Sequence, residues 1–438
     1  MTFAQAQAYL LGTINETASR RVPNRLDRMR ALLAALGDPQ DRYPSVQVGG
    51  TSGKGSTCTM IAAALGATGK KIGLHTKPHL TAVTERARID GIAIDEERFG
   101  EILGDMMPAI EAVANDHGRA SYYETLLAIA FVHFAHENVD IAVIEVGIGG
   151  TLDGTNVLHP LVSVITNVAL DHTEILGDTP TAIARDKVGI AKRGVPLVSD
   201  VGDPAARAVI EEGCAHAGAP FLSVRDLVRI EPYEGERYGQ SFAVITPADR
   251  YELAIPILGD FQQRNAATAV LALEQLPAGL RPDRAAIEAG FSRLLIPGRM
   301  EFFPSYPAVI FDIAHNPDKA QHLANALRHA FPERRFAFVI AVADTKDAGA
   351  IIAPFAELPA TFTFTSFDTD GRTATRPQRL ASLAGDLGIW GRAVTDPVDA
   401  FSIARRNADG DDIVVVTGST FVVATLRDWW LAHVASGV

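Results

Sequence analysis

The sequence contains little cysteine, since Cys58 and Cys214 are the only two among 438 residues. Two cysteines cannot build a disulfide framework or a cysteine-based zinc site, and they favour a reducing compartment. The sequence also lacks an uninterrupted apolar run of the ~18–20 residues that a membrane-spanning helix requires. Its first residues lack the basic and then apolar pattern of a signal peptide. We therefore expect a cytoplasmic protein that is not inserted in a membrane.

Positive charge is also scarce, because 40 Lys and Arg residues oppose 52 Asp and Glu residues and leave a formal net charge of −12. A dedicated nucleic-acid binder needs basic residues to neutralise phosphates, so this composition argues against a nucleic-acid partner. It does not exclude local binding of a small phosphate. With 47% hydrophobic and 21% charged residues, a disordered chain is excluded. The length predicts two or three domains.

The dominant pattern is a short β-branched run, a turn and then an Ala- and Leu-rich stretch with helical character. Such alternation predicts an α/β fold with a doubly wound parallel sheet and helices on both faces. Residues 228–257 instead alternate apolar and polar positions, which predicts a small antiparallel meander at the edge of the first domain. The Leu295–Gly298 segment resembles a linker. We therefore predict one doubly wound α/β domain at 1–296 and a smaller, Rossmann-like α/β domain at 297–438.

The strongest local signal is GGTSGKGST, residues 49–57, between a predicted strand and a predicted helix. Glycines let backbone amides curl around a phosphate, while the helix N-terminus and Lys54 add positive charge. The Ser56 hydroxyl is of the kind that ligates the Mg²⁺ of a nucleotide. The fit to the pattern G-x-x-x-x-G-K-[ST] is imperfect, because Val48 occupies the first position and Gly55 separates Lys54 from Ser56. The alternative is a glycine-rich turn with a solvated lysine.

Polar side chains also follow two other predicted strands. Glu145 ends a strongly apolar strand, where a carboxylate is costly unless it meets a cation. Because ligands gather beyond the carboxyl ends of parallel strands, Glu145 is a candidate Mg²⁺ ligand or catalytic acid. Asn167, Asp171 and His172 follow the next strand and suit a second metal or a phosphate. Taken alone, His172 would be structural and the later Lys187 would be solvated.

Eight segments occur in the order and approximate spacing of the Mur ligase superfamily. In chain order they read GGTSGKGST, EVGIGGTLDGTN, TNVALDHTEILG, RDKVGIAKRGVP, ILGDFQQRNAATA, PGRMEFF, FDIAHNPD and VVVTGST. Between about residue 20 and about residue 430 the chain resembles the folylpolyglutamate synthases most closely, which in bacteria are often also dihydrofolate synthases. The imperfect phosphate loop is this family's own form, G-T-x-G-K-G-S.

The resemblance implies an ATP-dependent ligase that adds L-glutamate to a folate, and to dihydropteroate in bifunctional members. ATP phosphorylates the acceptor carboxylate, the amino group of glutamate attacks the acyl phosphate, and an amide, ADP and phosphate result. The implied cofactors are ATP, Mg²⁺ at two sites, and a CO₂-derived carbamate on Lys187 that supplies anionic oxygen to a metal. Positioning and charge neutralisation are the protein's main contribution.

The resemblance also implies roles for individual residues. The implied nucleotide-binding residues are Thr51, Gly53, Lys54, Gly55, Ser56, Asn265, Arg299 and Asp312. The implied metal ligands are Ser56, Glu145, His172 and Lys187. The implied catalytic residues are Lys54, His172, Lys187, Asp312 and His315. The acceptor or the incoming glutamate is expected to contact Lys77, Pro78, His79, Tyr123, His315 and Ser419.

Two segments depart from the family's pattern. Lys77 replaces a serine in the loop TKPHL. Its cation could pair with the glutamyl carboxylates of a folate or indicate a different acceptor. The alternative is that Lys77 is an exposed surface lysine. The C-terminal Asp-Lys-Asp signature appears as ADTKD with one threonine inserted, and no role is assigned to Lys346 or Asp347. Tyr123 could lie near the pterin or in the core.

Two other function classes remain open at this point. One is a superfamily amide ligase that acts on a non-folate carboxylate, and the other is a nucleotide-binding regulatory module without catalysis. The combined presence of Lys54, Glu145, His172 and Lys187 argues against a mere binder. We expect small-molecule substrates, no nucleic-acid or membrane partner, and a monomer.

Overall fold

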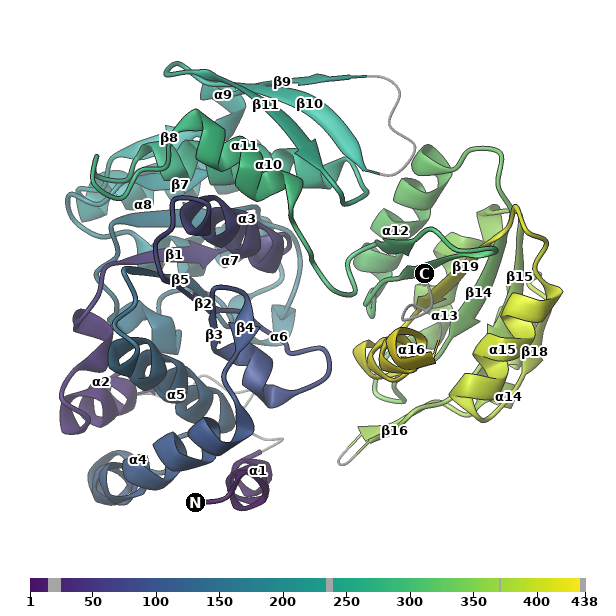
Figure 1. The fold of residues 1–438 in the computed structure, drawn as a ribbon, viewed down its shortest axis with the longest axis horizontal. Coiled ribbons are helices and arrows are strands. Elements are labelled where there is room, and N and C mark those ends of the chain that lie inside the picture. The colour runs from purple at the N-terminus through teal and green to yellow at the C-terminus, as the bar shows by residue number, and fades with distance from the viewer. Residues whose placement is uncertain (15–24, 234–238, 370–371, 434–438) are drawn as a thin grey trace. The chain divides into compact units, whose positions relative to one another are not determined.

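The computed structural model describes residues 1–14, 25–233, 239–369 and 372–433. The chain divides into two compact units (Figure 1). The first comprises Met1–Gly235, Ser241–Ile255 and Phe261–Leu294, and the second comprises Glu236–Gln240, Pro256–Asp260 and Leu295–Val438. Within the described residues, no helix combines the length and the apolar character that crossing a bilayer requires.

The first unit is built on an eight-stranded sheet with the strand order β4-β3-β2-β5-β1-β6-β7-β8. The strands from β2 to β8 in this order run parallel, and β3 and β4 add an antiparallel edge. Their bounds are β1 Ser45–Gly49, β2 Ile72–His75, β3 Arg88–Ile89, β4 Ile92–Ala93, β5 Ile141–Glu145, β6 Val162–Ile165, β7 Leu197–Ser199 and β8 Phe221–Ser223. Both faces are covered, so the central strands are buried along their whole length, as expected for a parallel sheet.

Helices cover both faces of this sheet (Figure 1). The helices α3 and α10 lie on one face, whereas α5 and α8 pack on the face that carries Ala142, Ile144 and Val146 of β5 and the residue after it. The helices of the unit are α1 Phe3–Gly12, α2 Arg25–Ala35, α3 Lys54–Gly66, α4 Glu96–His117, α5 Tyr122–His136, α6 Thr173–Leu176, α7 Pro180–Lys187, α8 Pro204–Ala217, α9 Val224–Leu227, α10 Phe261–Glu274 and α11 Arg284–Ser292. Short 3₁₀ turns η2 to η5 cover Pro39–Asp41, Val83–Arg86, Gly154–Val157 and Val188–Ile190.

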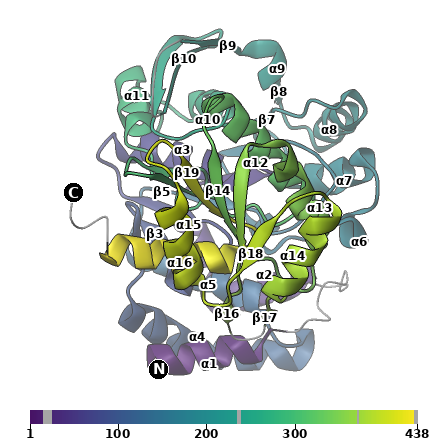
Figure 2. The ribbon, with the colours of Figure 1, turned by 90° about the vertical axis from the view of Figure 1, so that its right-hand side faces the viewer.

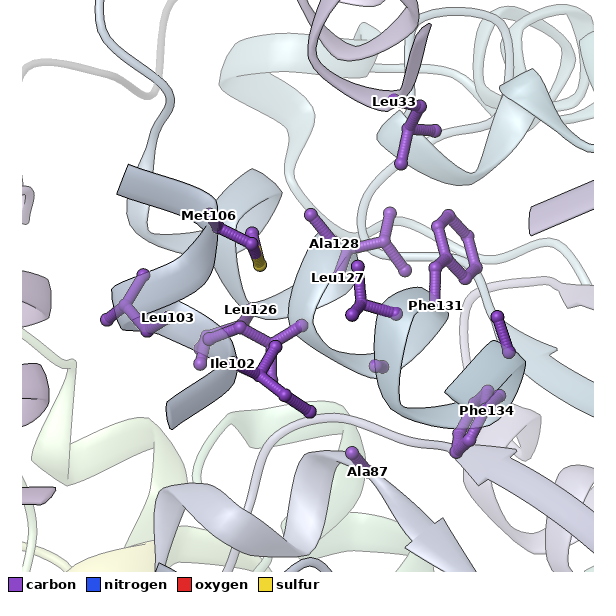
Figure 3. Close-up of a cluster of buried hydrophobic side chains, with 14 of the residues drawn as sticks. Leu33, Ala87, Ile102, Leu103, Met106, Leu126, Leu127, Ala128, Phe131 and Phe134 are labelled. Atoms are coloured by element: carbon purple, nitrogen blue, oxygen red, sulfur yellow. The ribbon is translucent and has the colours of Figure 1, made fainter. Parts of the chain in front are cut away.

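A large apolar cluster joins α4 and α5 to the sheet (Figure 3). Ile102, Leu103 and Met106 of α4 face Leu126 and other fully buried side chains of α5. The start of α5 is fixed by a capping box, in which the Ser121 hydroxyl and the Glu124 carboxylate each accept a hydrogen bond from the other residue's backbone N–H. The cluster fixes α4 and α5 against the sheet that carries the candidate site.

An ion pair inside this unit provides a stability test. Arg28 of α2 donates from Nε and Nη2 to the carboxylate of Glu124, whose side chain is fully buried. Removing one partner of a buried pair leaves the other charge uncompensated. We expect Arg28→Ala to lower the free energy of unfolding by about 3 kcal/mol or more in urea denaturation. Arg30→Ala is the control, because the pair that Arg30 forms with Asp27 is exposed, and equal losses in the two variants would contradict this expectation.

The predicted meander is confirmed as antiparallel, but it forms its own sheet. Its strands β9 Arg229–Pro232, β10 Gln240–Ile245 and β11 Arg250–Ile255 pair in the order β11-β10-β9. In the described part of the chain these strands do not extend the eight-stranded sheet, whose described edges are β4 and β8. Alternating burial along β11 shows that one face packs inward and the other meets solvent.

The second unit contains a six-stranded sheet with the order β12-β13-β19-β14-β15-β18, in which only β12 runs antiparallel. Figure 2 shows α12, α13 and α14 on one side of this sheet and α15 and α16 on the other. The strands are β12 Glu301–Phe303, β13 Ala308–Phe311, β14 Phe336–Ile340, β15 Ala360–Phe364, β18 Gly391–Ala393 and β19 Ile413–Thr417, with the short hairpin β16 Asp368–Thr369 and β17 Arg372–Thr373. The helices are α12 Pro317–Ala330, α13 Ala348–Ile352, α14 Pro377–Asp386, α15 Pro397–Asn407 and α16 Thr420–His433, with the 3₁₀ turn η6 Ala353–Glu357.

Two helices end in 3₁₀ geometry. The helix α13 is followed by η6 from Ala353, next to Pro354, which lacks the N–H that an α-helix would use. The helix α7 ends at Lys187 and continues as the 3₁₀ turn η5. The alternating sequence pattern does not by itself locate the strands β8 and β12. Both strands are only three residues long, too short for a clear periodicity.

Candidate active site

The glycine-rich segment forms a tight loop between β1 and α3. Gly53 is the N-cap of α3 with φ +80°, and Gly50 has φ +134°. A Cβ atom on Gly50 would overlap the Thr166 hydroxyl, and one on Gly53 would overlap the side chain of Asn265. Both positions therefore need glycine, for backbone conformation and for space. The loop carries the N-terminus of α3 at its end, which is the arrangement that binds phosphate in many nucleotide sites.

The loop is held in shape from the end of β6. Asn167 Oδ1 accepts hydrogen bonds from the backbone N–H of Thr51 at 3.2 Å and of Ser52 at 2.8 Å. The Thr51 hydroxyl donates to the carbonyl of Ala169 and accepts from its N–H. The polar groups of Thr51 are thus engaged within the protein. The sequence identified Asn167 as a metal or phosphate candidate, whereas the structure uses its side chain as a brace for the loop.

Loss of this brace should weaken nucleotide binding. We expect Asn167→Ala to raise the KM for ATP about 5- to 50-fold, because two hydrogen bonds that fix the loop, at roughly 0.5–1.5 kcal/mol each, are removed. Steady-state kinetics with ATP as the varied substrate measure the effect. The matched control is Asn325→Ala on the exposed surface of α12, which should leave the KM unchanged. A normal KM for ATP in Asn167→Ala would show that the loop holds its shape without the brace.

Three lysines gather at this loop. Lys54 Nζ donates to the carbonyl oxygens of Gly50 and Thr51, at 3.0 Å each, and Lys187 Nζ donates to the carbonyl of Gly50 at 2.8 Å. Burial, followed by the charges of Lys54 and Lys77, lowers the pKa of Lys187 to about 7. Burial and the nearby charge of Lys54 likewise lower the pKa of Lys77 to about 8. Lys187 is therefore a buried amine that is substantially neutral near pH 7.

The carboxylate of Glu145 lies beside the same loop. It is almost fully buried, and its Oε2 accepts the backbone N–H of Lys77 at 2.9 Å. An ideal Cβ on Gly55 would lie 3.4 Å from this oxygen, which places Glu145 against the first turn of α3. The Ser56 hydroxyl is buried and, among the described residues, has no hydrogen-bond partner. Glu145 at the end of β5 and Ser56 in the first turn of α3 thus place two oxygen atoms beside the phosphate loop.

His172 lies in the loop after β6, at the N-cap of α6, with φ +49°. Its ring nitrogens are 4.0 Å from an oxygen of Asp171 and 3.8 Å from one of Glu174. Burial lowers the pKa of His172, which favours the neutral ring that a metal requires. Across the described ranges, however, no three His, Cys, Asp or Glu side chains are grouped as a metal cage. A metal here needs other donors as well.

The loop after β2 contains the residues predicted to contact the acceptor. Pro78 is exposed, and His79 is half-buried with Nδ1 accepting from Arg86 Nε at 3.0 Å. Tyr123 at the start of α5 donates from its hydroxyl to Asp153 at 3.2 Å. The ring of Tyr123 also lies 6.3 Å from that of His75, which is completely buried. The aromatic and basic side chains of this region therefore come from β2, α5 and the loops between them.

Asn265 of α10 lies against Gly53 of the phosphate loop. Its Nδ2 donates to Gln262 Oε1 at 2.8 Å, and its amide is the group that a Cβ on Gly53 would strike. Thus the first unit brings Thr51, Gly53, Lys54, Gly55, Ser56, Lys77, Glu145, Lys187 and Asn265 to one loop and its surroundings. These residues are spread over 200 positions of the sequence.

In the second unit, Asp312 follows β13 and accepts the backbone N–H groups of Met300 and Ala314. Burial raises its pKa, and the charge of Arg299 opposes this rise. His315 donates from Nδ1 to the carbonyl of Ile313, and burial with the charge of Lys319 lowers its pKa to about 4. Arg299, Asp312 and His315 therefore form one electrostatic group at the carboxyl end of β13.

Ser419 and Asp347 of the second unit have local structural contacts. The Ser419 hydroxyl accepts the N–H of Phe421 at the start of α16, and the Asp347 carboxylate accepts the N–H of Ala350 as the N-cap of α13. Lys346 contributes to lowering the pKa of His315. Glu301 was not predicted as a site residue. It accepts hydrogen bonds from Arg427 and from the N–H of Gly298 and so fixes the segment that carries Arg299.

Comparison with known proteins now adds to this geometry. Residues 48–273 match the Mur ligase middle domain, and residues 298–420 match the glutamate ligase domain of Mur ligases. The chain belongs to the Mur ligase family. This Mur ligase is 32% identical to the dihydrofolate synthase/folylpolyglutamate synthase of Bacillus subtilis, over 92% of this chain and 94% of that protein. It is therefore also a member of the folylpolyglutamate synthase and dihydrofolate synthase group, as the sequence motifs predicted.

Solved structures resemble this Mur ligase over nearly its whole length. Mycobacterium tuberculosis folylpolyglutamate synthase complexed with ADP has a TM-score of 0.87 and 30% identity, with 98% of each chain covered. E. coli FolC in complex with DHPP and ADP has a TM-score of 0.85 and 27% identity, with 99% of this chain and 98% of that chain covered. The predicted α/β fold with a phosphate-loop domain and a C-terminal domain is confirmed.

A longer relative has a different organisation. The probable bifunctional folylpolyglutamate synthase/dihydropteroate synthase of Haloferax volcanii is 35% identical over 92% of this chain but only 48% of its own length. The chain therefore spans about half the length of this archaeal relative. As a Mur ligase, the chain is an ADP-forming acid–amino-acid ligase that uses ATP, as the sequence predicted.

Proposed function

We propose that this ligase adds L-glutamate to a folate and, as a second acceptor, to dihydropteroate. The observation that carries the proposal is the gathering of Lys54, Glu145 and Lys187 at one glycine-rich loop, in a chain whose relatives are named for these two reactions. In the proposed reaction a carboxylate oxygen of the acceptor attacks the γ-phosphorus of ATP and releases ADP. The amino group of glutamate then attacks the acyl phosphate carbon, loses a proton, and displaces phosphate to leave an amide.

The phosphate loop supports the first step through positioning and charge. The backbone amides at the start of α3 and the Lys54 ammonium would neutralise the phosphates, and Asn265, which lies over Gly53, would contact the adenine. Asn167 fixes the loop before nucleotide arrives, so little reorganisation is needed. Arg299 and Asp312 of the second unit would also bind nucleotide, and His315 and Ser419 the incoming glutamate. These roles follow the family resemblance.

The side chains of the first unit fit Mg²⁺ when the oxygens of a carbamate on Lys187 are counted as ligands. Ser56 and Glu145 would hold one ion, and His172 and a carbamate on Lys187 would hold a second. When bound, Mg²⁺ polarises phosphoryl oxygens and neutralises their charge. The unusual member is Lys187, whose pKa of about 7 provides the neutral amine that reacts with CO₂. Without that modification, this cluster offers a metal too few anionic oxygens.

The acceptor would lie along the loop after β2 and the start of α5. Lys77, Pro78, His79 and Tyr123 supply a cation, a flat apolar surface and two rings there, which suit a pterin and an anionic tail. We also propose a monomer in the cytoplasm. The two cysteines are free and buried, which suits a reducing compartment.

The deciding experiment measures ADP release by the purified protein with Mg²⁺, ATP and glutamate, offering dihydropteroate or tetrahydrofolate in turn. We expect each acceptor to stimulate ADP release in a glutamate-dependent manner, and mass spectrometry to find products heavier by one glutamyl residue. If neither acceptor stimulates release, the folate assignment is wrong although the ligase class remains. Stimulation by one acceptor alone would restrict the proposal to that reaction.

A further inference from the structure

Arg86 is a half-buried cation in the acceptor region that has no role in the chemistry described so far. It ends the 3₁₀ turn η3 and precedes β3, which pairs with β2. Its carbonyl accepts the Nδ1 hydrogen of buried His75 at 2.7 Å, and the next residue, Ala87, is part of the apolar cluster of Figure 3. Arg86 is therefore fixed at its backbone.

The side chain of Arg86 is equally well placed. Its guanidinium lies over the ring of Tyr122, 5.6 Å from the centroid, and its Nε donates to His79 Nδ1 at 3.0 Å. Among the described residues, the hydrogen bond to His79 is the only one that this guanidinium makes. The hydrogens on its two terminal nitrogens are therefore available for a ligand.

No carboxylate in the described part of the chain forms an ion pair with Arg86. The neighbouring Glu85 is already engaged, since it accepts the backbone N–H groups of residues 80–82 and pairs with Arg88 at 3.0 Å. Burial lowers the pKa of Arg86, as expected for a cation held away from water. A charge in this position is stabilised when an anion binds to it.

His79 orients the guanidinium. Because Nδ1 accepts from Arg86, the ring proton lies on Nε2, which points away from Arg86. Burial and the charge of Arg86 lower the pKa of His79 to about 4, so the ring stays neutral at physiological pH. The loop between the two residues is closed by the Glu85 carboxylate. His79 therefore fixes the orientation of the guanidinium, and the terminal N–H groups of Arg86 are left to bind the two oxygens of a carboxylate.

We propose that Arg86, oriented by His79, binds the non-reacting carboxylate of a glutamate-terminated folate, an inference that rests on the proposed function. A folate with a terminal glutamate has one carboxylate that is phosphorylated and one that is not, whereas dihydropteroate has only the carboxylate that reacts. The reacting group must reach the phosphate loop, where Lys54 provides the charge. Arg86 therefore recognises one acceptor and not the other, and it determines specificity between the two reactions.

The test compares both acceptors in Arg86→Gln, Arg86→Lys and the wild type. We expect Arg86→Gln to raise the KM for tetrahydrofolate about 10- to 100-fold, the loss typical of a charge-assisted hydrogen bond, and to leave the KM for dihydropteroate within about 3-fold. Arg86→Lys keeps the charge and should recover part of the tetrahydrofolate KM, which a merely structural role would not explain. Arg98→Gln, on the surface of α4, is the matched control and should change neither KM.

A substrate analogue isolates the carboxylate itself. Tetrahydrofolate with its non-reacting carboxylate converted to a carboxamide should bind the wild type about 10- to 100-fold less tightly, and Arg86→Gln should no longer distinguish the two compounds. An equal rise in KM for both acceptors, or full discrimination by Arg86→Gln, would overturn the inference alone. A wild type that uses neither acceptor would overturn the proposed function and this inference with it.

Discussion

Replacing Lys187 with methionine is expected to lower kcat at least about 100-fold with either acceptor, the typical loss when a group that stabilises transition-state charge is removed. Methionine has a similar volume but cannot form a carbamate. The wild type should also lose activity when dissolved CO₂ is removed and regain it when bicarbonate is added. Lys187→Met should not respond to bicarbonate. Initial rates of ADP release measured under controlled CO₂ provide both comparisons.

The stability of Lys187→Met separates a chemical effect from unfolding. Burial lowers the pKa of Lys187 to about 7 in the folded protein, below the ordinary lysine value of 10.5. The unfolded chain therefore binds more protons between these two values, so the native lysine costs stability as the pH falls from 10.5 towards 7. Methionine removes this cost. At pH 7 the free energy of unfolding of Lys187→Met should equal or exceed that of the wild type, and an active Lys187→Met would refute the carbamate proposal.

Replacing Lys54 with glutamine is expected to lower kcat/KM for ATP about 100- to 1,000-fold, because one full positive charge at the phosphates is lost. The Lys54 ammonium donates to two carbonyl oxygens of the phosphate loop, and among the described residues no carboxylate pairs with it. Its charge is thus available to an anionic ligand. The effect should be the same with both acceptors, since the nucleotide is common to both reactions.

Lys71→Gln provides the matched control for Lys54→Gln. Lys71 directly precedes β2 and pairs with Glu137 at the surface of the same unit. Its loss should change kcat/KM for ATP by less than about 2-fold, as exposed pairs contribute little. Tight ATP binding by Lys54→Gln in isothermal titration calorimetry, with normal turnover, would show that the loop binds the phosphates through backbone amides alone.

Much of the candidate site was predictable because its signals are local. The composition of the residues that flank Gly53, and their place between a predicted strand and a predicted helix, indicate a phosphate loop. The structure contains both the strand β1 and the helix α3. Glu145 was identified because a carboxylate at the end of an apolar strand is costly unless it meets a cation. The structure places it against the first turn of α3, next to that loop.

Other features were not predictable because they depend on contacts between distant segments. Asn167 braces a loop more than 110 positions earlier, and no local pattern distinguishes a brace from a ligand. The same applies to Glu301, which fixes the Arg299 segment through Arg427 at the other end of the second unit. The strand order of the meander was likewise not predictable, since alternation predicts strands but not their partners.

The α/β class, the phosphate loop and the family could be predicted from the order of residues, because they depend on short-range periodicity and on motifs in register. The net charge of −12 likewise implied that the charge that binds anions must be local. Which charges are left for ligands depends on the folded structure. Burial lowers the pKa of Lys187 to about 7, and Arg86 contacts His79 rather than Glu85, whose carboxylate pairs with Arg88. Solvation and pairing depend on the surroundings of a side chain, which the order of residues does not specify.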